Sequence, residues 1–203
     1  MPLDAPKTAG SPLPETMQLA ARLSFGMRDA RLVMVCGIRH DHGAAALAVQ
    51  LGSCFALMRG DQTATLDCAF DSTGRLEFKA LVGQGGLLEC LSEQGGPAIA
   101  GVQGPARGLR LLSLVGATGL SIDEFVGADL QGVAALLRER YKVCFLAAEP
   151  LLSSSMTYLL AGIVDGVVLT AVSALDRRDD VAAAGALLEQ MKMPVFGGVL
   201  IES

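Results

Sequence analysis

Short apolar runs alternate along the chain with longer stretches whose apolar positions recur at helical spacing. The apolar runs are rich in Val, Leu and Ile and carry almost no charge, which is typical of strands covered on both faces. The pattern predicts strands at residues 31–37, 63–70, 109–115, 143–148, 166–172 and 194–201, with residues 76–82 continuing the sheet.

Helices are expected between these strands. They fall at residues 15–25, 44–58, 87–92, 123–140, 153–162 and 178–192. Gly127 and Gly132 interrupt the fourth of them and predict a break there, and a serine of Ser153–Ser155 is expected to cap the fifth. Residues 83–108 are otherwise Gly-rich and read as loose loop. The alternation predicts an α/β fold with a doubly wound, mostly parallel sheet flanked by helices in three layers.

The length of 203 residues suits one such domain. Residues 1–14 carry four prolines and are expected to form a flexible N-terminal arm. Residues 15–203 are then a single domain.

Composition excludes several functions. The net charge of −5 argues against nucleic acid or an anionic membrane as a partner. No uncharged run reaches the roughly 18 apolar residues of a membrane span, and residues 1–14 do not resemble a signal peptide. The five cysteines form no C-x-x-C pair and are expected to be buried free thiols in a reducing compartment. These features predict a cytoplasmic protein without direct membrane insertion.

The segment from Cys36 to Gly43 joins a predicted strand to a predicted helix, which is the setting of a phosphate-binding loop. Such a loop needs a Lys to neutralise phosphates, followed by a Ser or Thr that holds Mg²⁺. This chain has Ala44 and Ala45 at those places, and Arg39 is the nearest cation that could substitute.

Three segments carry a resemblance to a known family: Tyr141–Pro150, Leu160–Leu169 and Pro194–Leu200. In order and spacing the chain resembles the cytoplasmic domain of the bacterial tyrosine kinases of capsule and exopolysaccharide assembly, over about residues 12–201. That family belongs with the deviant P-loop ATPases of the ParA/MinD type. The resemblance implies a P-loop NTPase fold, with a degenerate phosphate loop at Arg39, His42, Gly43, Ala44 and Ala45, and with Asp67 beside it.

The chain departs from the family at several separate points of that site. Asp67 keeps the first position of the family's Asp-x-Asp, but Ala69 stands at the second. Ala147 replaces the Asp that ends a central strand, and Met156 replaces an Asp of the following helix. Phosphoryl transfer depends on positioning and charge stabilisation, so these losses predict an inactive pseudokinase or pseudo-ATPase. No cofactor is expected, although residual ATP, ADP or anion binding stays open.

The family's ring-forming helix has a Glu-x-x-Arg-x-x-Arg pattern. Glu15 matches it, but Gln18 and Ala21 replace the arginines. A ring of self-phosphorylating kinases is therefore not expected.

The tip His40-Asp41-His42 could bind a metal with help from Cys36 or Asp67, or could be a polar loop that contacts a partner. Because adjacent loop residues rarely converge on one ion, no metal site is predicted.

The resemblance predicts a scaffold or regulatory partner in exopolysaccharide or capsule synthesis or export. Its partners would be proteins, such as the chain-length or export machinery, and one of them could recruit it to the inner membrane. A homo-oligomer is also open. The alternatives are a non-hydrolysing nucleotide or anion sensor of the ParA/MinD type, and an unrelated Rossmann-like small-molecule enzyme.

Overall fold

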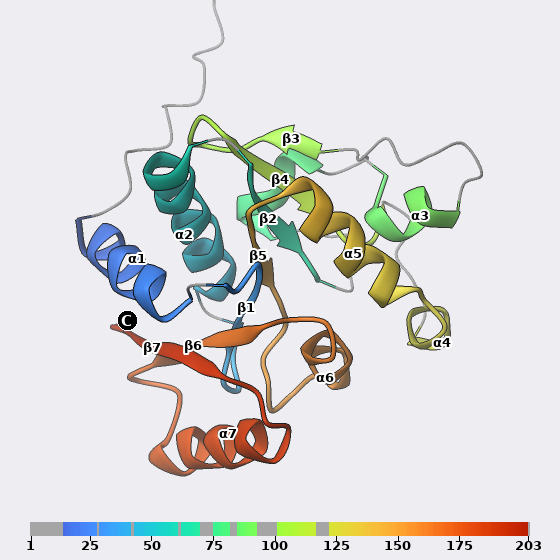
Figure 1. The fold of residues 1–203 in the computed structure, drawn as a ribbon. Helices are drawn as coiled ribbons and strands as arrows, with labels where there is room; N and C mark the ends of the chain where they lie inside the picture. Colours follow the sequence, from blue (N-terminus) through green and yellow to red (C-terminus); the bar gives the residue numbers. More distant parts are fainter. Residues whose placement is uncertain are drawn as a thin grey trace, which may run out of the picture.

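The computed structural model describes residues 14–27, 29–41, 43–60, 62–69, 75–81, 85–92, 101–116 and 122–202. The described strands form one seven-stranded sheet in the order β3-β4-β2-β5-β1-β6-β7 (Figure 1). The strands are β1 (Leu32–Gly37), β2 (Thr63–Asp67), β3 (Gly101–Gln103), β4 (Leu109–Ser113), β5 (Val143–Ala147), β6 (Gly166–Val172) and β7 (Val195–Ile201). All pairs are parallel except β3 with β4. The predicted mostly parallel sheet is confirmed.

Helices cover both faces of this sheet (Figure 1). One apolar core lies under α1 (Pro14–Gly26) and α2 (Ala44–Arg59). The other lies under α3 (Leu87–Ser92), α4 (Ile122–Val126), α5 (Leu130–Arg140), α6 (Ser155–Ala161) and α7 (Arg178–Gln190). The central strands β1, β2 and β5 are buried along their whole length, which explains their continuous apolar pattern. The three-layer α/β fold is therefore confirmed.

Two predictions about local structure were wrong. Residues 76–82 do not continue the sheet, because Leu76–Leu81 forms a 3₁₀ helix, η1. Its buried residues Phe78 and Leu81 are three apart, which fits a 3₁₀ turn rather than a strand. The segment predicted to be loose contains β3, which pairs Val102 with Leu111 across an antiparallel ladder. A three-residue strand that begins with Gly carries no periodic signal.

The predicted helix boundaries are mostly confirmed by their caps. The break near Gly127 separates α4 from α5, and the Asp129 carboxylate accepts the Gly132 N–H at 2.8 Å to cap α5. Ser154 caps α6 by accepting the Met156 N–H at 3.2 Å. Pro14 occupies the first position of α1, where a missing N–H has no consequence. The rest of the predicted arm, residues 1–13, lies outside the described residues. No helix in the described ranges is long and apolar enough to cross a membrane.

Asp165 ties three elements together at the amino end of the sheet. Its carboxylate accepts the Arg31 and Leu32 N–H groups at 2.7 and 2.8 Å, which fixes the start of β1. It also pairs with the Arg138 guanidinium of α5 at 2.7 Å. Burial raises the pKa of this carboxyl, but the two backbone N–H groups and Arg138 outweigh burial, and the net pKa lies below the usual 3.8.

Asp165→Asn should therefore lower stability at neutral pH. A lowered pKa in the folded state stabilises the protein above the ordinary pKa of Asp, and this stabilisation disappears as pH falls through the folded pKa. We expect a loss of about 1–2 kcal/mol at pH 7, given the partial exposure of the group. The difference in unfolding free energy between the variant and the natural chain should shrink toward zero in acid. Urea denaturation at several pH values measures it, with the exposed Asp29→Asn as the control; a deficit independent of pH would contradict this role.

Four cysteines, Cys36, Cys54, Cys68 and Cys144, are buried, and Cys90 is half-buried; all five are free thiols. Burial raises the pKa of Cys36 to about 12, with a further contribution from Asp41. Burial also raises the pKa of Cys68 and Cys144. Since the thiolate is the reactive form, these three side chains are inert in the folded protein.

Titration of the native protein with a disulfide reagent should label one thiol rapidly, and Cys90→Ala should abolish that fast phase. The remaining thiols should react only after denaturation. Rapid labelling of two or more thiols in native Cys90→Ala would show that the strand ends open more readily than the fold implies.

Candidate functional site

The loop between β1 and α2 turns sharply at its start. A Cβ on Gly37 would collide with the carbonyl oxygen of His40, so only Gly lets the chain fold back over itself here. Gly43 precedes α2 with a φ of 78°, and an added Cβ would lie 2.6 Å from Cδ1 of Ile201. Both glycines are therefore required by backbone geometry, whether or not a phosphate binds.

The carbonyl oxygens of the loop are held by the segment that follows β5. The N–H groups of Leu151 and Leu152 donate to the carbonyls of Gly37 and Ile38, each at 2.8 Å. The Ser153 hydroxyl donates to the carbonyl of Arg39 at 2.9 Å. These hydrogen bonds hold residues 37–39 of the loop against the segment that follows β5.

The structure places the predicted phosphate-loop residues in different surroundings. Arg39 pairs with Asp180 of α7, with Nη2 and Oδ1 2.7 Å apart, so its guanidinium is directed to α7. That hydrogen bond, helped by the Arg177 N–H, lowers the pKa of Asp180. Ala44 and Ala45 are buried in the core under α2. His42 lies outside the described residues.

Arg75, which sequence reasoning missed, occupies the carboxyl ends of the central strands. Its Nε lies 2.8 Å from Oδ2 of Asp41 in the β1–α2 loop, and its Nη1 lies 3.4 Å from Oδ1 of Asp67 at the end of β2. It also donates to the carbonyls of Ala147 and Ala148 at 2.7 and 3.1 Å. Its side chain is only 12% exposed. One guanidinium therefore joins three chain segments at the edge where ligands bind in parallel sheets.

Two of the positions that the resemblance singled out, Asp67 and Ala147, contact this guanidinium. Asp67 and Ala147 are direct neighbours in the β2–β5 ladder. Ala147 contributes only its carbonyl oxygen, and Met156 is an apolar, buried residue of α6. In the sequence, Arg75 is a single arginine between a predicted strand and an apolar segment. Its spacing from Asp67 matches no known motif, so the sequence alone does not mark it as a site residue.

Carboxylates outnumber the single Arg75 guanidinium in this cluster. Burial raises the pKa of Asp41, and Glu149 and Glu77 raise it further, while the Arg75 guanidinium opposes the shift. Arg is protonated at every accessible pH, so Arg75 cannot act as a general base. Within the described part of the chain, no three His, Cys, Asp or Glu side chains are placed to hold a metal ion.

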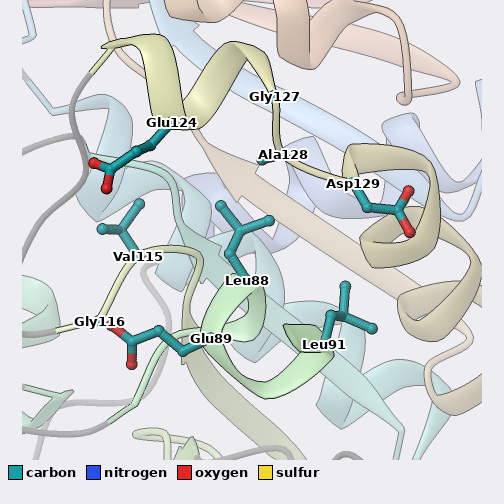
Figure 2. Close-up of a pocket in the computed structure, with 9 residues that line it drawn as sticks. All are labelled: Leu88, Glu89, Leu91, Val115, Gly116, Glu124, Gly127, Ala128 and Asp129. Atoms are coloured by element: carbon teal, nitrogen blue, oxygen red, sulfur yellow. The ribbon is translucent and has the colours of Figure 1, made fainter. Parts of the chain in front are cut away.

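Two clefts lie near the sheet. One, of about 670 Å³, starts at Gly43 and runs between α1, the first turns of α2 and the end of β7. The other, of about 400 Å³, lies between α3 and the α4–α5 junction (Figure 2). Figure 2 shows the Asp129 carboxylate on the opposite side of this pocket from the carboxylates of Glu89 and Glu124. Glu89 accepts the Gly86 N–H, and Asp129 caps α5.

Comparisons place this fold among known structures. The BceF tyrosine kinase domain is 22% identical, with a TM-score of 0.73 over 93% of this chain and 76% of that one. The kinase domain of the Escherichia coli tyrosine kinase ETK is 18% identical, with a TM-score of 0.76 over 92% of this chain and 74% of that one. A ParA family ATPase from Chlorobium tepidum is 13% identical, with a TM-score of 0.59 over 85% of this chain and 73% of that one. No family model and no curated protein matches the sequence.

The chain therefore has the P-loop NTPase fold that bacterial tyrosine kinase domains share with ParA/MinD ATPases, as the resemblance predicted. At these identities the likeness establishes the fold, and function has to be argued from the site.

Arg75→Ala should destabilise the protein by roughly 2–4 kcal/mol, because it leaves two carboxylates and two strand-end carbonyls without their shared donor. Arg107→Ala removes the same charge at an exposed position and should change stability little. Urea denaturation of both variants measures the difference. Equal stabilities would show that Arg75 does not hold the strand ends together.

Proposed function

We propose that this protein is a catalytically inactive relative of the capsule tyrosine kinase domains, acting as a scaffold or regulatory partner in exopolysaccharide or capsule synthesis or export. The observation that carries the proposal is the contact of the Arg75 guanidinium with Asp67 and with the carbonyl of Ala147. A cation supplied by the chain itself stands at the strand ends, where the resembled family is expected to hold phosphates and a metal.

Phosphoryl transfer needs a cation on the β- and γ-phosphates and a metal held by oxygen ligands. Here Ala44 and Ala45 supply neither, and Arg39 is paired with Asp180. The remaining acidic candidate, Asp67, is already neutralised by Arg75. The residues present support retention of the fold with loss of the reaction.

A scaffold role requires a partner, and the proposed class is the chain-length or export machinery, which would also recruit this protein to the inner membrane. Support comes from the resemblance and from the tyrosine kinase domains among the similar structures. One of these is a chimerical protein, CapA2B2, which is 16% identical over 96% of this chain with a TM-score of 0.76.

A second candidate function, a nucleotide or anion sensor, is favoured by one observation. The cleft of about 670 Å³ begins at Gly43, beside the N-terminus of α2, where helix N–H groups favour negative charge. Its rim carries Glu15 and Glu202, which oppose an anion.

Calorimetric and thermal-shift titrations with ATP and ADP, each with and without Mg²⁺, should show no saturable micromolar binding and no turnover. Arg75→Ala should not restore either, because the Lys and the metal ligands are still missing. Micromolar Mg-ATP binding with turnover would contradict the proposal. Micromolar binding without turnover would favour the sensor instead.

In cells, deletion of the gene should reduce surface polysaccharide, and a copy carrying Arg39→Ala should restore it fully. The reason is that a scaffold does not need the positive charge of Arg39 to bind a phosphate. Surface polysaccharide measured in both strains tests this. Failure of a stably folded Arg39→Ala protein to complement would show that the loop has a ligand-dependent role.

A further inference from the structure

β7 forms one edge of the sheet, and within the described ranges it pairs with β6 alone. Its residues, Val195–Ile201, include no charged side chain and no proline. Natural edge strands are normally protected by charges, by prolines or by being very short. The opposite edge, β3, follows this rule with three residues. The β7 edge does not.

One face of β7 is bare. Val195, Gly198 and Leu200 stand in register with Val167, Leu169 and Ala171, whose side chains pack on the core that α7 covers. Yet Val195 is 51% and Leu200 is 64% exposed, and Gly198 is exposed as well. The apolar surface of the sheet thus continues past the last residues that α7 buries.

Backbone direction identifies the groups that face outward. The carbonyl of Ile201 accepts the Ser173 N–H at 3.0 Å, so Ile201 faces β6. Because backbone groups alternate along a strand, Val199 and Gly197 face β6 too. The N–H and C=O groups of Gly198 and Leu200 are then presented to the free edge.

We infer that a second copy of the chain adds to this edge, with the two β7 strands antiparallel about a two-fold axis at Val199. In that register Leu200 lies opposite Gly198 of the second copy, and Gly198 lies opposite Leu200. These are the residues whose backbone groups face outward, so each pair exchanges two hydrogen bonds. Gly197 lies opposite Ile201 as a pair without hydrogen bonds, because the backbone groups of both residues face β6.

The occupant is a second copy because the edge is self-complementary. Leu200 and Ile201 each meet a glycine across the axis, Val199 meets Val199 of the second copy, and no like charges are opposed. In a two-fold interface the same strand of both copies lies on the axis, so that strand has to be complementary to itself. The register of β6 with β7 is irregular between Val167 and Val168, and this irregularity bends β7 before Gly197. The proposed ladder between the two copies therefore begins at Gly197.

Sedimentation equilibrium of the full chain over a range of concentrations should show a species of twice the 21.0 kDa chain mass. Gly198→Pro is the sharpest variant, because no atom lies within 4 Å of an added Cβ in one copy and proline is tolerated on an edge strand where its missing N–H would face outward. In the dimer this change removes the N–H that would be donated to Leu200 of the second copy. Leu200→Lys places a charge on the same edge. Each variant should weaken dimerisation at least about tenfold.

Leu57→Lys, at a side chain 55% exposed on α2, is the matched control and should leave the dimer unchanged. Hydrogen exchange of the natural chain gives an independent readout: the Gly198 and Leu200 amides should become protected as concentration rises. A monomer at every concentration would overturn the inference. So would a dimer that both variants leave intact, or edge amides whose exchange ignores concentration.

Discussion

The Arg75 guanidinium is the interaction on which the functional end of this molecule depends. It contacts Asp41 of the first loop, Asp67 of β2 and the carbonyl oxygens at the end of β5, so three separate segments share one donor. In a nucleotide-binding relative, the mutual repulsion of loop carboxylates and strand-end carbonyls would be relieved by a metal ion and its ligands. Here the Arg75 guanidinium places a positive charge among the corresponding groups.

The position of the Arg75 guanidinium offers a physical reason for a departure from the resembled family, the alanine at position 147. Once a covalently attached cation neutralises Asp67, a carboxylate at position 147 would add a negative charge that nothing balances. Alanine at position 147 avoids that additional negative charge, and its backbone carbonyl still accepts a hydrogen bond from the Arg75 guanidinium. Without phosphates to neutralise, Arg39 can pair with Asp180 and fix the loop to α7. The Arg75 contacts thus account for Ala147, while Ala69 and Met156 have no such structural explanation.

The layer order and most element boundaries could be predicted because they follow from local patterns. Buried parallel strands such as β1 and β5 read as unbroken apolar runs, and Asp129 and Ser154 mark helix starts by their own hydrogen bonds. The 3₁₀ helix η1 and the strand β3 could not be predicted, because three to six residues carry too little periodicity. Arg75 was out of reach for another reason: its partners are brought together only by the sheet, from positions up to 73 residues away.

The two ends of the fold are constrained differently. At the carboxyl ends of β2 and β5, the described polar groups that Arg75 contacts have partners within the chain. At β7 the reverse holds, since apolar side chains and outward backbone groups remain exposed along a strand with no charge. Unsatisfied surface, rather than the conserved shape of the fold, indicates where a protein still gains free energy by binding. The exposed edge at β7 is therefore a stronger candidate for a binding surface than the strand ends that Arg75 joins.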